Sequence, residues 1–219
     1  MIPFDFSRAR ELMVEQQVRP WDVLEPRVLD VLARVPREDF VLPEHRALAY
    51  ADLALPIARG GGEGESMLKP VLAGRVLQSL KVRPGEDVLE IGTGSGYLTA
   101  CLAALGRDVV SIERHASLAD AARARLASAR IGNAQVLHED ARTFASDRRF
   151  DVVCVTGAVA ELPPAWLRWL EPTGRLFVVQ GRAPAMQACV VQADGRSEVL
   201  FETDLPYLAG FAPVPVFEL

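Results

Sequence analysis

The sequence predicts an α/β fold with a mostly parallel sheet of seven strands, flanked by helices on both faces. From residue 81 onward, apolar and β-branched runs alternate with segments that suit helices. The first run leads directly into a glycine-rich turn at residues 92–96, and the second ends at the acidic residue Glu113. A strand, a glycine turn and an acid about 20 residues further on are typical of folds that bind a nucleotide cofactor at the carboxyl edge of the sheet.

The N-terminal part of the chain, residues 1–80, is predicted to be a helical extension packed on the main domain. A helix is expected at residues 7–18, because apolar side chains can share one face and Ser7 can serve as N-cap. A second helix is expected near 25–34, where Pro26 suits a first helical turn.

The segment that joins this extension to the main domain is predicted to be irregular at first. Residues 36–57 contain prolines at 36, 43 and 56, which favour loop and extended chain. The glycine run at 59–66 is typical of a linker or a mobile lid. A helix is expected at 70–80.

Residues 81–219 are predicted to form the main domain, as one globular unit. The clearest helix is 116–130, and its Arg123, Arg125 and Arg130 are expected to face solvent. The expected strands are 87–92, 108–112, 134–138, 151–156, 175–180, 187–192 and 197–205. Trp166 and Trp169 are expected on a helix that packs on the sheet.

Composition excludes several classes of protein. Half of the residues are hydrophobic and 24% are charged, as in globular proteins, and the formal charge of −5 argues against a nucleic-acid scaffold. The cysteines Cys101, Cys154 and Cys189 form no zinc or disulfide pattern, and the histidines show no ligand spacing, so no metal site is expected. No apolar run is long enough for a membrane helix and no signal peptide is evident, which predicts a cytoplasmic protein without a membrane partner.

The glycine turn identifies the kind of cofactor. Its pattern is E-x-G-x-G-x-G, with Glu90 as the acid and Thr93 and Ser95 between the glycines Gly92, Gly94 and Gly96. A dinucleotide fingerprint would need a glycine at Tyr97, so a nicotinamide-dependent oxidoreductase is disfavoured. The pattern resembles the S-adenosylmethionine loop of class I methyltransferases, whose sheet is Rossmann-like.

Other strand ends carry candidate cofactor ligands. Glu113, next to Arg114, can accept both ribose hydroxyl protons. Asp140 and Ala141 could meet an adenine, although Asp140 could instead cap the next short helix. Thr156 could face the transferred group or only satisfy the end of its strand.

Most of the chain resembles the protein-L-isoaspartate O-methyltransferase family. The blocks that carry the resemblance are, in order, MVEQQV, VLDVLARVPREDFV, AYADLALPI, VLEIGTGSGYLTACLA, IER, FDVVCVTGA and GRLFVV. The resemblance implies S-adenosylmethionine as methyl donor and methylation of an isoaspartyl carboxylate in damaged proteins. It also implies that Glu113 holds the ribose and that Asp140 and Ala141 hold the adenine.

One block departs from the family at the chemistry. The family pattern G-Q-T-I-S-x-P is replaced by residues 64–70, which places Leu68 at the active-site serine and Ser66 at the threonine. The C-terminal V-R-F-V-P-L stretch is replaced by residues 200–206. Leucine cannot donate a hydrogen bond to a carboxylate, so isoaspartyl peptides are expected to be poor substrates. Ser66 or Lys69 could supply the missing donor.

Three functions therefore stay open at the level of sequence. The first is a methyltransferase of the isoaspartyl type, acting on a protein or peptide. The second is a methyltransferase for another acceptor, including a small molecule. The third is a protein that binds S-adenosylmethionine without catalysis and works through partner contacts. The oligomeric state is not predicted.

Overall fold

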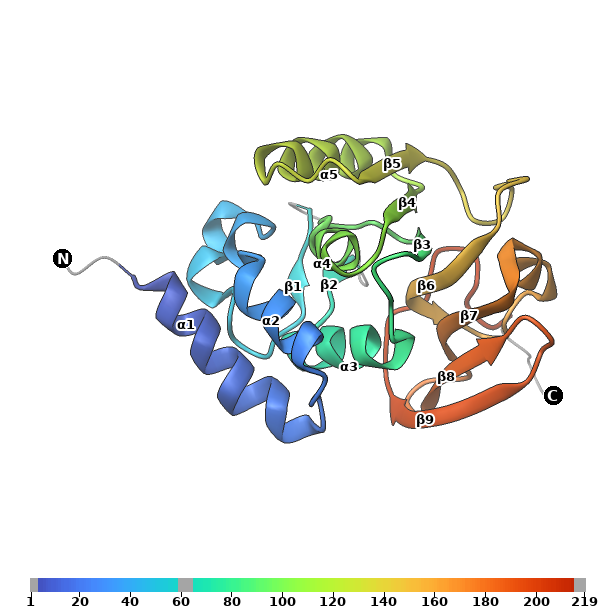
Figure 1. Ribbon diagram of the computed structural model, residues 1–219, viewed down its shortest axis with the longest axis horizontal. Coiled ribbons are helices and arrows are strands. Elements are labelled where there is room, and N and C mark those ends of the chain that lie inside the picture. The colour runs from blue at the N-terminus through green and yellow to red at the C-terminus, as the bar shows by residue number, and fades with distance from the viewer. Residues whose placement is uncertain (1–3, 59–64, 215–219) are drawn as a thin grey trace.

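Seven strands form one sheet in the computed structural model, which describes residues 4–58 and 65–214 (Figure 1). The order across the sheet is β5-β4-β3-β6-β7-β8-β9. The first five strands in this order, β5, β4, β3, β6 and β7, pair in parallel. Strands β8 and β9 follow β7 as an antiparallel meander. The strands are β3 (Asp87–Ile91), β4 (Asp108–Glu113), β5 (Ala134–His138), β6 (Phe150–Val159), β7 (Leu170–Gln180), β8 (Met186–Gln192) and β9 (Ser197–Thr203). The predicted fold class is confirmed.

Alternating side chains of the central strands enter two separate apolar cores. On β3, Val88 belongs to the core under the helices, whereas Leu89 and Ile91 belong to the core on the opposite face. This period of two is what a strand buried on both faces requires. Val88 lies opposite Val109 of β4 and Val152 of β6, so the register places like side chains in one layer.

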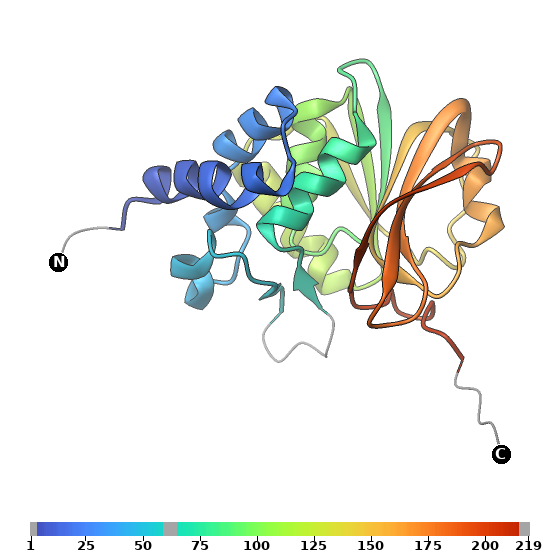
Figure 2. The same cartoon turned by 90° about the horizontal axis from the view of Figure 1, so that it is seen from below.

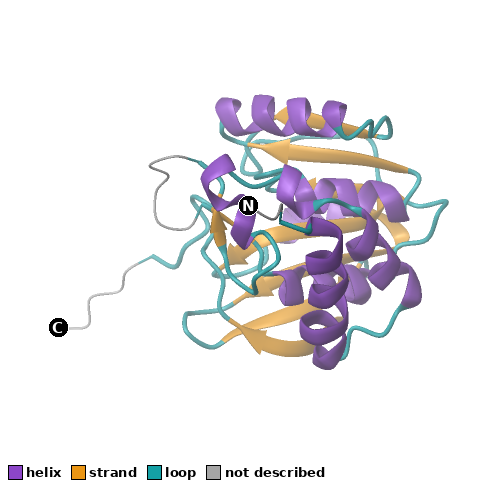
Figure 3. Cartoon of the chain, turned by 90° about the vertical axis from the view of Figure 1, so that its left-hand side faces the viewer, coloured by secondary structure: helices purple, strands orange, loops and turns teal. Residues whose placement is uncertain are grey.

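The two faces of the sheet are covered differently (Figure 2). The α-helices lie on one side, with the N-terminal helices outermost (Figures 2 and 3), and the short 3-10 helix η5 (Pro164–Trp169) lies on the other (Figure 2). Trp166 and Trp169 of η5 are buried and stacked with ring centroids 5.9 Å apart, as expected for a helix that covers the sheet. The helices are α1 (Phe6–Met13), α2 (Pro26–Arg34), α3 (Pro70–Leu80), α4 (Tyr97–Leu105) and α5 (Ala116–Ser128).

The first helix begins one residue earlier than predicted and changes type along its length. Its N-cap is Asp5, whose carboxylate accepts the Arg8 N–H at 2.9 Å, so the prediction of Ser7 as N-cap is wrong. A carboxylate caps at least as well as a hydroxyl and also favours the positive end of the helix. After α1 the chain continues as the π-helix η1 (Val14–Val18) and the 3-10 helix η2 (Arg19–Trp21).

The irregular segment after α2 contains short elements only. These are the 3-10 helices η3 (Arg37–Asp39) and η4 (Pro43–Leu48), and strand β1 (Leu55–Pro56), which pairs with β2 (Ser66–Met67). The Ile57 N–H donates to the Glu65 carbonyl at 3.1 Å, so the chain on the two sides of the glycine run is joined at the β1–β2 pair. The glycine run is predicted to be a linker or a lid, and its residues 59–64 lie outside the part of the chain that the structure describes.

Helix α5 packs on the sheet with Leu118, Ala122 and Leu126 buried, close to the prediction. Arg125 is the exception, because its side chain is half-buried and donates to the Ser95 carbonyl at 3.2 Å. The expectation that this arginine faces solvent is therefore wrong. None of the helices in the described ranges has the length and apolar character needed to span a bilayer.

Candidate active site

The carboxyl edge of the parallel strands opens into a cavity of about 700 Å³. Its walls come from the glycine turn, the ends of β4, β5 and β6, the segment 65–69, and the residues that follow β9. A cavity of this size suits a nucleoside-sized ligand together with the reacting part of a second molecule. The predicted cofactor side and the predicted acceptor side therefore share one space.

The glycine turn is shaped for close approach of a ligand to the backbone. Gly92, Gly94 and Gly96 have φ values of +94°, +53° and +85°, which side chains with a Cβ rarely adopt. A Cβ on Gly92 would overlap the hydroxyl of Thr156, which donates to the Gly92 carbonyl at 2.6 Å. Gly96 is the N-cap of α4 and lies against Ala122 of α5, so it allows close helix packing rather than lining the cavity.

Glu113 lies where an acid can hold two hydroxyl groups. It is buried at the end of β4 and lines the cavity. Its Oε2 accepts the N–H of Gly94 at 2.9 Å, and its Oε1 accepts the N–H of His115 at 3.0 Å. Each oxygen keeps further acceptor capacity, so the carboxylate is oriented by the turn and still able to accept hydroxyl protons from a ribose.

The end of β5 supplies a second acid. Asp140 lines the cavity next to Ala141, and its carboxylate accepts the Arg142 N–H at 2.9 Å. Hydrogen bonds from the Arg142 side chain, the nearest at 2.6 Å, lower the pKa of Asp140 to about 2. Asp140 is therefore ionised and oriented on the cavity wall. Residues 141–143 form a turn and not a helix, so the alternative that Asp140 caps a short helix is wrong. Arg114 and Thr156 also line the cavity.

Glu90 supports the turn from behind. Its side chain is completely buried, does not line the cavity, and accepts the hydroxyls of Thr99 at 2.5 Å and Ser111 at 2.6 Å. Ser111 in turn bonds Thr93 at 2.6 Å. Burial raises the pKa of Glu90 to about 7. The acid of the glycine motif thus joins α4, β4 and the turn, and a direct cofactor contact is not supported for it.

The segment that replaces the family's serine block forms another part of the wall. Ser66, Leu68 and Lys69 all line the cavity; Ser66 and Leu68 are half-buried and Lys69 is exposed. Lys69 is the residue before α3 and Ser66 belongs to β2. Neither polar side chain makes a hydrogen bond within the described chain, so both remain free to donate to a ligand.

Several wall residues were not predicted from the sequence. Trp21, 59% exposed, reaches the cavity from the N-terminal extension. Leu208 packs over Gly157, and Tyr207 bridges to Ala158 of β6. The buried Arg37 also lines the cavity, and its sequence signal is its place within the block VLDVLARVPREDFV. These residues meet only through tertiary contacts.

No group of histidines, cysteines and acids in residues 4–58 and 65–214 could hold a metal ion. The cysteines Cys101, Cys154 and Cys189 are buried and free. Burial raises the pKa of the Cys101 thiol to about 12, which makes it unreactive at neutral pH.

Comparison with known proteins gives a consistent result. The family model described as Protein-L-isoaspartate(D-aspartate) O-methyltransferase (PCMT) matches residues 8–209. The chain is 38% identical over 189 residues to the protein-L-isoaspartate O-methyltransferase of Koribacter versatilis, covering 86% of this chain and 82% of that protein. It is 34% identical over 218 residues to the Nitrobacter winogradskyi protein of the same name, covering 97% and 99%.

A solved structure supports the fold. The Plasmodium falciparum beta-aspartate methyltransferase (PCMT), in complex with S-adenosyl-L-homocysteine, superposes with a TM-score of 0.78 at 18% identity. The match covers 91% of this chain and 97% of that chain. At this identity the similarity concerns the course of the backbone.

Proposed function

Because the chain belongs to the protein-L-isoaspartate(D-aspartate) O-methyltransferase family, we propose that it transfers a methyl group from S-adenosylmethionine to a carboxylate of a protein or peptide. The observation that carries the proposal is the shared cavity, which is lined both by the glycine turn with Glu113 and by the segment 66–69. A protein that only binds the cofactor needs no room for an acceptor in the same cavity. The relatives named above act, by their names, on isoaspartate.

The residues on the cofactor side fit S-adenosylmethionine. Gly92 and Gly94 line the cavity with positive φ values and carry no side chain between their backbone and a ligand. Glu113 would hold the ribose hydroxyls, and Asp140 with Ala141 would hold the adenine. When bound, the cofactor supplies an electrophilic methyl group on a sulfonium sulfur.

The chain itself has to orient the acceptor and exclude water. An acceptor carboxylate is already ionised near neutral pH, so no general base is required and positioning supplies most of the rate. Apolar side chains on the acceptor side, among them Met67, Leu72 and Leu205, reduce competition from water. Ser66 and Lys69 are the side chains of this wall segment that can donate to a carboxylate.

Leu68 makes isoaspartyl peptides poor substrates in this proposal. Its side chain lines the cavity at the position of the family's serine and offers no hydrogen bond. Glu202 and Asp204 line the same cavity and would repel a carboxylate, whereas Glu65 is paired with His115 at 3.2 Å. Loss of one hydrogen bond to a charged group costs about 1.5–3 kcal/mol, which corresponds to about ten- to a hundred-fold in rate.

The experiment combines a binding and a transfer assay. Calorimetry with S-adenosylmethionine and S-adenosylhomocysteine should show binding to the wild type. Methyl transfer to an isoaspartyl peptide should be slow, absent for the same peptide with a normal aspartate, and at least about ten-fold faster in Leu68→Ser. Fast transfer by the wild type would refute the role of Leu68. Absence of cofactor binding would refute the proposed function.

A further inference from the structure

A buried positive charge beside the cavity has no counterion among the residues that the structure describes. Arg37 is only 1% exposed, yet its guanidinium makes no ion pair with any carboxylate in the described ranges. Nε donates to the Ala49 carbonyl and Nη2 to the Leu68 carbonyl, both at 2.8 Å, whereas Nη1 has no hydrogen-bond partner. A buried ion of this kind is costly unless a ligand of opposite charge compensates it.

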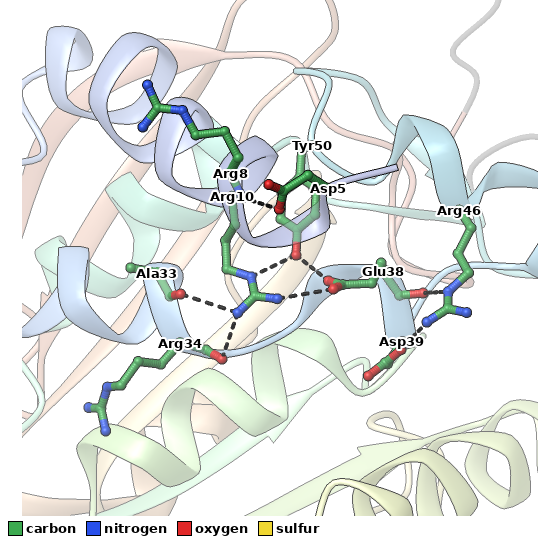
Figure 4. A network of polar contacts seen from close by, with 9 residues as sticks. All are labelled: Asp5, Arg8, Arg10, Ala33, Arg34, Glu38, Asp39, Arg46 and Tyr50. Atoms are coloured by element: carbon green, nitrogen blue, oxygen red, sulfur yellow. Dashed lines mark hydrogen bonds and ion pairs between the residues drawn. The ribbon is translucent and has the colours of Figure 1, made fainter. Parts of the chain in front are cut away.

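The adjacent carboxylate is held by other residues, as Figure 4 shows. Glu38 Oε1 accepts from Arg10 at 3.0 Å, and Oε2 accepts the hydroxyl of Tyr50. Arg10 also donates to Tyr50 at 2.8 Å, and Arg46 donates to the Glu38 carbonyl at 3.2 Å. This network fixes the turn η3 on the outer side, so the Glu38 charge is neutralised there and does not serve Arg37.

Other acids near Arg37 also fail to pair with it. Asp39 pairs with Arg46 at 2.7 Å on the exposed side of the turn. Asp52 is exposed and accepts the Val71 N–H at 3.1 Å, and it attracts Arg37 only through space. Burial lowers the pKa of the Arg37 guanidinium, but arginine stays charged at any physiological pH.

The guanidinium lies at the boundary between the two halves of the cavity. Through Leu68 it supports the acceptor wall, and it stacks over the Tyr97 ring at 5.0 Å. Tyr97 is the first residue of α4, directly after the glycine turn, where the helix dipole is also positive. A ligand carboxylate that reaches this boundary would meet a positive field in apolar surroundings.

We propose that Arg37 is the specificity residue that makes the cavity select a carboxylate at the boundary between its cofactor half and its acceptor half. The planar, permanently charged guanidinium matches a carboxylate better than a neutral amide of the same shape. The carboxylate can come from the amino-acid part of the cofactor or from the acceptor. This inference rests on the proposed function and names the chemical group that its site requires.

The test compares carboxylate ligands with neutral ligands of similar shape, by calorimetry. In the cofactor arm the pair is S-adenosylhomocysteine and its decarboxylated analogue. In the acceptor arm, with S-adenosylhomocysteine present, the pair is an isoaspartyl peptide and the same peptide with its isoaspartyl carboxylate as carboxamide. The proteins are the wild type, Arg37→Gln, Arg37→Lys, and Arg46→Gln as the matched control on the outer side of the same turn.

In one arm the wild type should bind the carboxylate ligand with an affinity at least about ten-fold higher than the neutral ligand. That arm identifies whether the cofactor or the acceptor supplies the carboxylate. Arg37→Gln should bring the preference close to one while the affinity for the neutral ligand stays unchanged. Arg37→Lys should keep part of the preference, and Arg46→Gln should keep all of it. A structural role alone would lower both affinities of a pair equally.

Two results would overturn the inference. The first is a wild-type preference close to one in both arms, which requires no variant and so holds even if Arg37→Gln does not fold. The second is an equal loss of affinity for both ligands in Arg37→Gln. If S-adenosylhomocysteine binds normally in either case, the proposed function survives. If it does not bind to the wild type, the proposed function fails and this inference fails with it.

Discussion

Replacing Glu90 by glutamine should change how the stability of this protein depends on pH. The carboxyl group is completely buried, and its Oε1 has no hydrogen-bond partner. Burial raises its pKa from 4.5 to about 7, against the hydroxyls of Ser111 and Thr99 that favour the ionised form. A glutamine has the shape of the protonated acid and cannot ionise.

The sign and size follow from the two pKa values. The pKa of Glu90 is higher in the folded state than in the unfolded state. Its contribution to the free energy of unfolding is therefore fully present below pH 4.5 and is lost as the pH rises through about 7. The complete loss is about 3 kcal/mol, and about 2 kcal/mol of it falls between about pH 5.5 and pH 9. The variant should therefore gain about 2 kcal/mol over the wild type across this interval.

Urea unfolding followed by circular dichroism measures the free energy of unfolding at each pH. The new amide N–H groups lack partners and add an offset that does not depend on pH, so the slope decides the result. Glu86→Gln is the matched control. Burial would raise the pKa of Glu86, but hydrogen bonds and charge from Arg175 and Arg83 outweigh burial and lower it. The change in the free energy of unfolding caused by Glu86→Gln should therefore be constant over this pH interval. A difference between Glu90→Gln and wild type that stays constant with pH would refute the reasoning.

Three further substitutions test the cofactor side by calorimetry with S-adenosylhomocysteine. Gly92→Ala should weaken binding at least about ten-fold, because a Cβ would overlap Thr156 and the φ of +94° disfavours alanine, while Gly85→Ala, in open space, should bind normally. Glu113→Gln should weaken binding at least about ten-fold through loss of charge-assisted hydrogen bonds to hydroxyls, and unchanged affinity would exclude the ribose role. Arg125→Met should lower the affinity for S-adenosylhomocysteine about three-fold, because it removes one hydrogen-bond donor to a carbonyl of the glycine turn.

The elements that could be predicted from the sequence are those set by local patterns. The seven strands and helices 25–34 and 70–80 follow from periodicity, and the structure confirms them, although β7 begins at Leu170 and not at the predicted residue 175. The glycine turn is predictable because a positive φ strongly favours glycine. The N-cap was placed wrongly because Ser7 and Asp5 are both good caps only two residues apart.

The remainder of the site depends on tertiary contacts that no local pattern reports. Arg37 and Arg125 are ordinary polar residues in the sequence, and only the fold buries the first and turns the second toward the glycine turn. Trp21 and Leu208 reach one cavity from positions far apart in the chain. Glu90 matches the motif, yet the structure turns its side chain away from the cavity toward α4 and β4.

The cavity joins residues from Trp21 to Phe211, and this has a consequence for synthesis of the protein. Strands β3 to β7 and their helices can form while the chain is still emerging from the ribosome, but the wall that contains Leu208 is added afterwards. Ligand binding stabilises whichever state of the chain carries the binding residues, since it acts by mass action on that state. A chain that stops before residue 205 would therefore keep the residues proposed to hold the cofactor, from Gly92 to Thr156, but would lack the part of the wall that contains Leu208.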